Sequence, residues 1–446
     1  MSKASKARSA QPGVRRIAML TLHGYVDAKP VLGKTDTGGQ VVYVLELSKA
    51  LARKGIKVDI YTRRFQKRKT EEKVAPNVRI IRIPCGGDRF INKERLLPHL
   101  GRFADNMLKY MEKEGLEYDI FHSHYWDAGY TAMKVTEKLG HFFIHTFHSL
   151  GAWKKEHMGG DPKKAEKLYR FRERIKNEKL IFAKASSFVM TSSAMVTSSR
   201  KYYGYRKKNN VVIPAGVNAS FYRPLKKGEK DRKIDVPRNY AFWVGRFDTN
   251  KGLDYLLRGF AAALPKTRDL FLVIGGGSKN PKPREETLRK ELDRIIKKYE
   301  LSNRVFFVRH IKDALMPSYY RQAEFFVLPS KFEPFGMTAA EAMACGCPVI
   351  VSKRAGIKKY LTSGKNCLSV NCSNKADLGW AFKVLDRNST FRKKIAKNGL
   401  KLAKKKFSWE SIADQSMEHY EMVMKNAASR HQKKPGSARE RRKNAG

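Results

Sequence analysis

The sequence predicts an α/β protein of two domains, each built on a parallel sheet of the dinucleotide-binding type. Three observations predict this fold. Apolar strand-like runs alternate with helical segments along most of the chain, a polar stretch divides the alternation into two halves, and 446 residues exceed what one core usually holds. We expect the two Rossmann-like domains to face each other across a cleft, because ligands on open α/β sheets bind at the carboxyl ends of the strands.

The first half opens with an apolar strand over residues 17–22, a glycine-bearing loop and a helix that begins near Gln40. Apolar residues at helical spacing support the helix, and Gly55 is placed to follow its last turn. A strand over 57–61 completes one βαβ unit. Further strands are expected at 78–83, 119–122, 142–147 and 187–191, with a helix over 100–114.

A polar, charged stretch over 226–239 is interpreted as the linker between the domains. After it, strands are expected at 240–244, 270–274, 305–308, 325–328 and 348–351, with a helix over 253–263. The predicted organisation is therefore an N-terminal domain over 16–225, the linker, and a C-terminal domain over 240–409. A helix at about 410–425 is expected to pack back on the first domain, and disordered basic tails are expected over 1–15 and 426–446.

The chain is strongly basic, with a net charge of +50. The two terminal segments carry only a small part of this charge, so the body itself is expected to make weak electrostatic contacts with polyanions or an anionic membrane surface. No zinc-ligand spacing, aromatic RNA-binding strand or basic heptad accompanies the charge. This argues against a dedicated nucleic-acid binder.

Cysteine usage and the N-terminus indicate a cytoplasmic protein. The five cysteines include no C-x-x-C pair and leave one unpaired in any disulfide scheme, which is typical of a reducing compartment. The first sixteen residues lack the apolar core of a signal peptide, and no run of about 18 apolar residues occurs.

Two loops combine glycine with a strand end and a helix start, where backbone N–H groups and the helix dipole favour phosphate. The first loop contains Gly38 and Gly39 in the run Asp-Thr-Gly-Gly-Gln. The second places Arg246 after a strand and Lys251 at a helix start, so that two cations would converge on one diphosphate and stabilise a departing nucleotide. Tight turns and solvated cations are the alternative interpretation.

Two carboxylates eight positions apart, Glu333 and Glu341, bracket the loop between a buried strand and an apolar helix. The loop between them contains Phe335, Gly336, Met337 and Thr338. With Glu333 ahead of the helix and Glu341 about two turns inside it, one would meet sugar hydroxyls and the other would accept hydrogen bonds from a ribose diol. No two aspartates are separated by one residue, so the D-x-D pattern of metal-dependent transferases is absent and no metal site is expected.

Taken together, these motifs resemble the retaining family-4 glycosyltransferases of the GT-B fold. The resemblance also rests on Pro-x-Gly-Val-Asn at 214–218, and runs at 36–40, 93–100, 124–129 and 148–151 are similar to sucrose-phosphate synthases and their relatives. It covers roughly residues 16–425. It implies a retaining hexosyltransferase without cofactor or metal, with UDP-glucose as leading donor and fructose 6-phosphate as leading acceptor, so that the product is sucrose 6-phosphate.

The resemblance also implies roles for single residues. His148, which follows an apolar strand, would contact the donor sugar near the reacting centre. The catalytic set is then His148, Arg246, Lys251 and Glu333. Donor binding would use Gly38, Gly39, Arg246, Lys251, Phe335, Gly336, Met337, Thr338 and Glu341, with the two cations on the diphosphate and Glu341 on the ribose. Acceptor binding, on the N-terminal side, would use Gln40, Lys93, Lys154, Arg172 and Arg174, although Arg170 alternates with the last two and leaves the choice among the three arginines open.

Alternatives remain at several points. The donor sugar is alternatively a mannosyl group, and the acceptor is alternatively free fructose, an inositol phosphate or an anionic lipid. Arg309 stands near the donor base where relatives usually have a glycine, which leaves the base open, and Asn218 replaces a commoner aspartate. A noncatalytic sugar-nucleotide sensor or an RNA-associated binding protein is the rival class. Without the resemblance, a structural histidine is the favoured interpretation of His148, as it is of His122 and His124.

Overall fold

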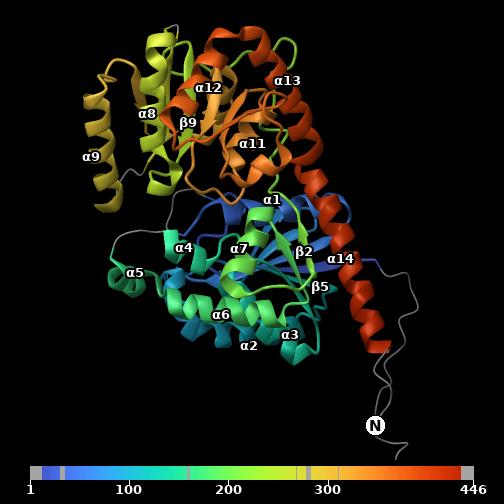
Figure 1. Cartoon of the computed structure of the whole chain (residues 1–446). Coiled ribbons are helices and arrows are strands. Elements are labelled where there is room, and N and C mark those ends of the chain that lie inside the picture. Colours follow the sequence, from blue (N-terminus) through green and yellow to red (C-terminus); the bar gives the residue numbers. More distant parts are fainter. Residues whose placement is uncertain are drawn as a thin grey trace, which may run out of the picture. The chain divides into compact units, whose positions relative to one another are not determined.

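The computed structural model describes residues 13–30, 36–157, 161–267, 269–277, 283–309 and 311–432. Of the tails expected over 1–15 and 426–446, residues 1–12 and 433–446 lie outside this description. The chain divides into two compact units (Figure 1). Unit 1 comprises Met1–Val189, Arg200–Val211 and Ala413–Gly446, and unit 2 comprises Met190–Ser199 and Val212–Ile412. The boundary after Val211 falls ahead of the expected linker at 226–239, so residues 212–225 group with unit 2.

Unit 1 is built on an eight-stranded sheet in the order β3-β4-β2-β1-β5-β6-β7-β8. Its strands are β1 (Arg16–Leu20), β2 (Lys57–Arg64), β3 (Glu71–Ala75), β4 (Val78–Pro84), β5 (Ile120–His124), β6 (Phe143–Thr146), β7 (Ser187–Met190) and β8 (Asn210–Val212). The central strands pair in parallel, and β3 runs antiparallel to β4 at the edge. The central strands are buried on both faces because helices cover the sheet, which is why they read as continuous apolar runs.

The helices of unit 1 follow the strands as expected of βαβ units. They are α1 (Gly39–Arg53), α2 (Leu97–Lys113), α3 (Trp126–Leu139), α4 (Gly151–His157), α5 (Pro162–Tyr169) and α6 (Phe171–Lys184), with the single turn η1 (Lys93–Arg95), and α7 (Ser193–Tyr203) contributes to both units. Helix α3 packs on α2 and α6. Gly55, with φ +87°, follows the C-cap of α1, as predicted.

Unit 2 is built on a six-stranded sheet in the order β11-β10-β9-β12-β13-β14, whose described pairs are all parallel. Its strands are β9 (Tyr240–Gly245), β10 (Phe271–Gly276), β11 (Val305–Val308), β12 (Phe325–Leu328), β13 (Val349–Ser352) and β14 (Leu368–Val370). Its helices are α8 (Leu253–Ala263), α9 (Pro283–Lys298), α10 (Met316–Gln322), α11 (Met337–Ala344), α12 (Lys375–Arg387) and α13 (Ser389–Lys406). Helices α8 and α12 pack side by side (Figure 1). The prediction of two Rossmann-like α/β domains is confirmed.

The C-terminal helix α14 (Trp409–Gln432) runs past residue 425, where the sequence predicted a disordered tail to begin. From Ala413 onward it belongs to unit 1. There the Tyr420 hydroxyl lies 2.7 Å from Nδ1 of His122, and Nε2 of His419 lies 2.9 Å from the Ser187 hydroxyl. No helix in the described part of the chain is long and apolar enough to span a membrane.

Candidate functional site

In unit 2, the predicted diphosphate cation and the predicted sugar-binding carboxylate touch each other. Lys251 closes the turn η2 (Thr249–Lys251), which Asp248 caps by accepting a hydrogen bond from the N–H of Asn250. Its ammonium Nζ lies 2.6 Å from Oε2 of Glu333, a residue 82 positions further along the chain. Both side chains keep part of their surface in solvent, so a bound anion or sugar would reach them.

Two glycines hold the loops at this edge of the sheet in conformations that other residues would strain. Gly252 has φ +70°, and a Cβ there would lie 2.3 Å from the carbonyl oxygen of Pro329. Gly336 has φ +116°, and a Cβ there would lie 2.8 Å from Cδ2 of Leu328. The glycines therefore let the loops that carry Lys251 and Glu333 pack closely against the carboxyl end of strand β12.

The Pro-Phe-Gly loop leads directly into α11. Phe335 is buried and its ring packs edge-on against Phe407 at 5.4 Å. Met337 and Thr338 are partly exposed in the first turn of α11. The N–H groups of a first helical turn have no partner within the helix, so this turn can donate to the oxygens of an anion or a sugar.

Glu341 lies just over one turn inside α11, not two, because the helix begins only at Met337. Its Oε2 accepts a hydrogen bond of 2.9 Å from the hydroxyl of Tyr320, a residue of α10 that the sequence did not single out. Burial raises the pKa of Glu341 to about 7, although the Tyr320 hydrogen bond opposes the rise. A ribose diol that donates hydrogen bonds to this carboxyl would favour its ionised form.

Arg246 is exposed and leaves the end of β9 directly after Gly245. The next residue, Phe247, lines an open hollow in unit 2. The lining of this hollow consists of Phe247, Gly276, Arg289, Leu292, Asp293, Phe307 and Arg309. Arg309 therefore lies with the rings of Phe247 and Phe307 beside the strand end that carries Arg246. It is the residue that left the identity of the donor base undecided in the sequence.

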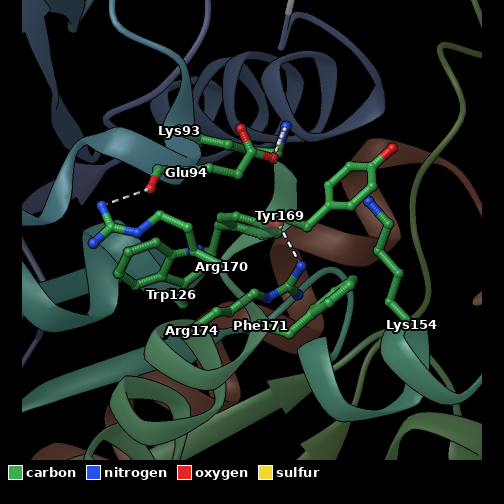
Figure 2. Close-up of a pocket in the computed structure, with 9 residues that line it drawn as sticks. Lys93, Glu94, Trp126, Lys154, Tyr169, Arg170, Phe171 and Arg174 are labelled. Atoms are coloured by element: carbon green, nitrogen blue, oxygen red, sulfur yellow. Dashed lines mark hydrogen bonds and ion pairs between the residues drawn. The ribbon is translucent and has the colours of Figure 1, made fainter. Parts of the chain in front are cut away.

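In unit 1, three of the predicted acceptor-binding residues line one small basic hollow (Figure 2). These are Lys93, Lys154 and Arg174. Arg170 lines it as well, together with Glu94, Tyr125, Trp126, Tyr169 and Phe171. The ammonium of Lys154 lies over the ring of Tyr169, 4.4 Å from its centroid. Four cations around one small hollow would attract an anion such as a phosphate.

Arg172 lies outside this hollow, exposed on α6, where its N–H donates to Glu166. The reason is a break between α5 and α6 at Arg170, which has φ +47° and turns its own side chain into the hollow. The guanidinium of Arg170 is 2.7 Å from a carboxylate oxygen of Glu173. Of the three alternating arginines, Arg170 and Arg174 face the hollow.

Arg174 is buried and most of its hydrogen-bonding capacity is used within unit 1. It donates to Glu178 at 2.8 Å, to the Tyr125 hydroxyl at 2.7 Å and to the Ser149 carbonyl at 2.8 Å. Its guanidinium also lies over the ring of Tyr125. This arrangement makes Arg174 a fixed positive wall of the hollow.

Lys93 pairs with two carboxylates at the mouth of the glycine loop. Its Nζ contacts Asp36 and lies 3.1 Å from Oε1 of Glu94. Although burial opposes it, the neighbouring Tyr125, Asp36 and Glu94 raise the pKa of Lys93, so the ammonium stays charged. A phosphate at this position would compete with Asp36 for the lysine.

The glycine loop itself begins α1, with Gly38 as N-cap and Gly39 as the first helical residue. Gln40 points back under the loop, and its amide nitrogen donates to the Thr21 hydroxyl at 3.1 Å and to the His124 carbonyl at 3.2 Å. Gln40 therefore ties the helix start to the ends of β1 and β5.

His148 is the central residue of a strained turn. The N–H of Ser149 donates to the carbonyl of Phe147 at 2.7 Å, and His148 between them has φ +59°. This is the rare form of the three-residue turn, and such strain gathers at functional sites. Its Nε2 lies 3.0 Å from Nδ1 of the buried His124, so His148 is part of a histidine pair and not a lone side chain.

No group of three or more histidine, cysteine or acidic side chains within the described ranges is arranged to hold a metal ion. Two contacts were not predicted from the sequence, Tyr320 with Glu341 and His124 with His148, and the predicted set contained Arg172 where Arg170 lines the basic hollow. Each joins residues that are distant in sequence or displaced by a local break, so spacing along the chain gave no signal for it.

Comparison with known proteins gives matches along nearly the whole chain. Residues 37–221 match the profile of Glycosyltransferase Family 4, and residues 226–402 match that of the Glycosyl transferases group 1. The mannosylfructose-phosphate synthase of Agrobacterium fabrum is 36% identical over 407 residues, 90% of each chain. The probable sucrose-phosphate synthase of Thermosipho melanesiensis is 33% identical over 420 residues, 89% of this chain and 94% of that protein.

Among solved structures, the sucrose-phosphate synthase from Thermosynechococcus elongatus superposes with a TM-score of 0.78 at 28% identity, covering 92% of this chain and 100% of its own. Two Rossmann-like units, one of which pairs a lysine with a glutamate at its strand ends, define a glycosyltransferase of the GT-B fold. The chain belongs to the family-4 glycosyltransferases and is similar to sucrose-phosphate and mannosylfructose-phosphate synthases.

Proposed function

We propose that the protein is a retaining hexosyltransferase that moves a hexose from a nucleotide-diphosphate sugar to fructose 6-phosphate. We base the acceptor on the basic hollow of unit 1, around which Lys93, Lys154, Arg170 and Arg174 gather four cations that would attract a phosphate. A dianionic phosphate gains charge-assisted hydrogen bonds there that a neutral sugar does not. UDP-glucose is the leading donor, and the product would be sucrose 6-phosphate.

The names of the similar proteins support fructose 6-phosphate as the acceptor more strongly than they support UDP-glucose as the donor. Sucrose phosphate and mannosylfructose phosphate both contain a phosphorylated fructose unit, but one carries a glucosyl group and the other a mannosyl group. A mannosyl donor is therefore the principal alternative to UDP-glucose. An inositol phosphate or an anionic lipid headgroup is the alternative acceptor, since each also presents a phosphate.

In the proposed mechanism, the acceptor hydroxyl attacks the anomeric carbon on the face that the nucleotide leaves. The bond from this carbon to the diphosphate oxygen breaks, and that oxygen takes the proton of the acceptor hydroxyl. Arg246 and Lys251 stabilise the charge that develops on the diphosphate, while Glu333 and the backbone of 335–338 hold the transferred sugar. Glu341 would accept hydrogen bonds from the ribose.

Because Arg246 and Lys251 supply the positive charge, we propose that no metal or other cofactor takes part. Transfer should then continue in the presence of EDTA, whereas a loss that added metal restores would contradict the proposal. We also propose that the protein works in the cytoplasm, which the five buried free cysteines support. The basic surface would add weak contacts with polyanions or anionic membranes.

The decisive experiment is a matrix of nucleotide sugars against acceptors, read by nucleotide release. The donors are UDP-glucose, GDP-mannose and ADP-glucose, and the acceptors are fructose 6-phosphate, fructose, inositol phosphate and vesicles with anionic lipid. Release that depends on fructose 6-phosphate supports the proposal, and the anomeric configuration of the product tests retention. Nucleotide binding without release in any combination would favour a noncatalytic sensor, and salt-resistant binding to RNA would favour the RNA-associated alternative.

A further inference from the structure

Three side chains of unit 1 form a short hydrogen-bonded row that ends at His148. Met19 lies on β1, and its sulfur is 3.4 Å from Nε2 of His124 at the end of β5. On the other side of the same ring, Nδ1 of His124 is 3.0 Å from Nε2 of His148. Because each atom in the row is either a donor or an acceptor, the row determines where the hydrogens lie.

The thioether decides the state of His124. Burial, and then the neighbouring His122 and His148, lower the pKa of His124 far below its usual range, so the ring is neutral and carries one hydrogen. A thioether sulfur accepts hydrogen bonds and has no hydrogen to donate. Nε2 of His124 therefore carries the hydrogen, because a bare nitrogen would face the lone pairs of the sulfur. Nδ1 of His124 is left as an acceptor.

The state of His148 follows from that of His124. An acceptor at Nδ1 of His124 requires a donor at Nε2 of His148. Burial lowers the pKa of His148 to about 3, so this ring is also neutral and its single hydrogen is the one that it donates. Nδ1 of His148 is then bare, and the Tyr43 ring, 5.0 Å away in an edge arrangement, restricts the imidazole further.

We infer that Met19 and His124 are positioning residues that fix His148 as the Nε2–H tautomer, so that Nδ1 of His148 accepts a hydrogen bond from a hydroxyl of the bound sugar. The hydrogen bond from the sugar rests on the proposed function, whereas the tautomer of His148 rests only on its contacts with His124 and Met19. In this state His148 selects a ligand group that donates, and it is not a proton donor to a leaving group. The strained turn at His148 holds the ring in the row.

The tautomer is tested on the full chain with ¹⁵N-labelled histidine, because long-range NMR spectra distinguish protonated from bare ring nitrogens. We expect a protonated Nε2 and a bare Nδ1 at His148 throughout pH 6–8, with the signals assigned by their loss in His148→Gln. Met19→Leu removes the sulfur at similar volume and should mix the tautomers of both histidines. The matched control is Met107→Leu, another fully buried methionine of unit 1, which should leave the signals unchanged. A bare Nε2 in the wild type, or no change in Met19→Leu, would overturn the inference.

The ligand role is tested with UDP-glucose and fructose 6-phosphate whose hydroxyls are replaced one at a time by hydrogen or by fluorine. Fluorine accepts hydrogen bonds weakly and never donates one. At the hydroxyl that donates to His148, replacement by hydrogen and replacement by fluorine should therefore lower kcat/KM about equally, by roughly 3- to 10-fold. In His148→Ala this penalty should disappear. Retention of activity with fluorine but not with hydrogen would show that His148 donates, and it would refute the acceptor role. Absence of transfer by the wild type would instead refute the proposed function and leave the NMR result to decide the tautomer.

Discussion

Replacement of Lys251 by alanine separates catalysis from stability more cleanly than other changes in unit 2. The ammonium is 2.6 Å from Glu333, and the two side chains retain 26% and 14% of their exposure. If Lys251 stabilises the leaving diphosphate, its contribution grows as the bond breaks, and its loss should lower kcat about 10²- to 10³-fold. This corresponds to about 2.7–4 kcal/mol of activation free energy.

The same substitution should change the free energy of unfolding by no more than about 1 kcal/mol, because partly exposed ion pairs contribute little. Turnover is measured by nucleotide release at saturating donor, and stability by urea unfolding of the same preparation. Lys331→Ala is the matched control. Its Nζ pairs with Asp254 at 2.9 Å and its exposure of 32% is similar, but it has no proposed role in catalysis. Lys331→Ala should lose less than about 1 kcal/mol of stability and keep near wild-type turnover.

Two outcomes would refute this reasoning. If Lys251→Ala turns over within about threefold of the wild type, the lysine does not stabilise the leaving group. If the Lys251 and Lys331 variants lose turnover equally, the effect comes from the loops at this edge of the sheet and not from charge at the diphosphate. Arg246→Ala should behave like Lys251→Ala, because the two cations are assigned to one diphosphate.

Further predictions concern the acceptor, acid stability and the termini. Lys154→Ala should raise the KM for fructose 6-phosphate by an amount that corresponds to about 1.5–3 kcal/mol of binding free energy, and it should leave the KM for free fructose almost unchanged. An equal rise in KM for both acceptors would contradict the phosphate role. The buried His122 and His419, with pKa values lowered to about 3 and about 4, take up protons only on unfolding. Each should therefore remove up to about 1.4 kcal/mol of stability per pH unit as pH falls from about 6.5 toward 4. The pKa of Glu341 is raised to about 7, so this residue takes up a proton in the folded state and offsets the loss of stability from one histidine. The free energy of unfolding measured in urea should therefore still fall between pH 7 and pH 5. A free energy that does not change with pH would contradict the burial of the histidines. Deletion of 1–12 and 433–446 should leave turnover on soluble acceptors unchanged, and loss of folding would show that a terminus packs on the body.

The strands could be predicted from the sequence because burial on both faces demands continuous apolar runs. The predicted 325–328 coincides with β12, whose four residues are all buried. The predicted 305–308 coincides with β11, an edge strand that is apolar although Phe306 and Phe307 are exposed. Strand β3 was missed because an edge strand with the sequence Glu-Glu-Lys-Val-Ala has neither an apolar run nor alternation. The helices α4 to α6 were missed for a related reason, since their exposed faces carry many charges that mask the periodicity.

The site could be predicted only as far as residue type and strand-end position determine it. The resemblance placed Lys93, Lys154 and Arg174 in one acceptor-binding set, and the structure brings them around one hollow. Their role toward a phosphate stays a prediction. The choice of Arg170 over Arg172 depends on a single left-handed residue between two helices, which the local sequence does not specify. Tertiary contacts such as Tyr320 with Glu341 depend on how two helices pack, and spacing carries no information about that.

The return of α14 to unit 1 has a consequence for how the chain is made. During synthesis, residues 13–189 leave the ribosome long before residue 413, so the first sheet is nearly complete while the helix that supplies Tyr420 and His419 is still missing. Until then His122 and Ser187 each lack one of the hydrogen-bond partners that they have in the finished protein. Unit 2 is encoded almost entirely inside this interval, so it is fully synthesised before α14 is. A fragment that stops at the boundary after residue 211 would carry the basic hollow and His148 but would leave the first domain without its last helix.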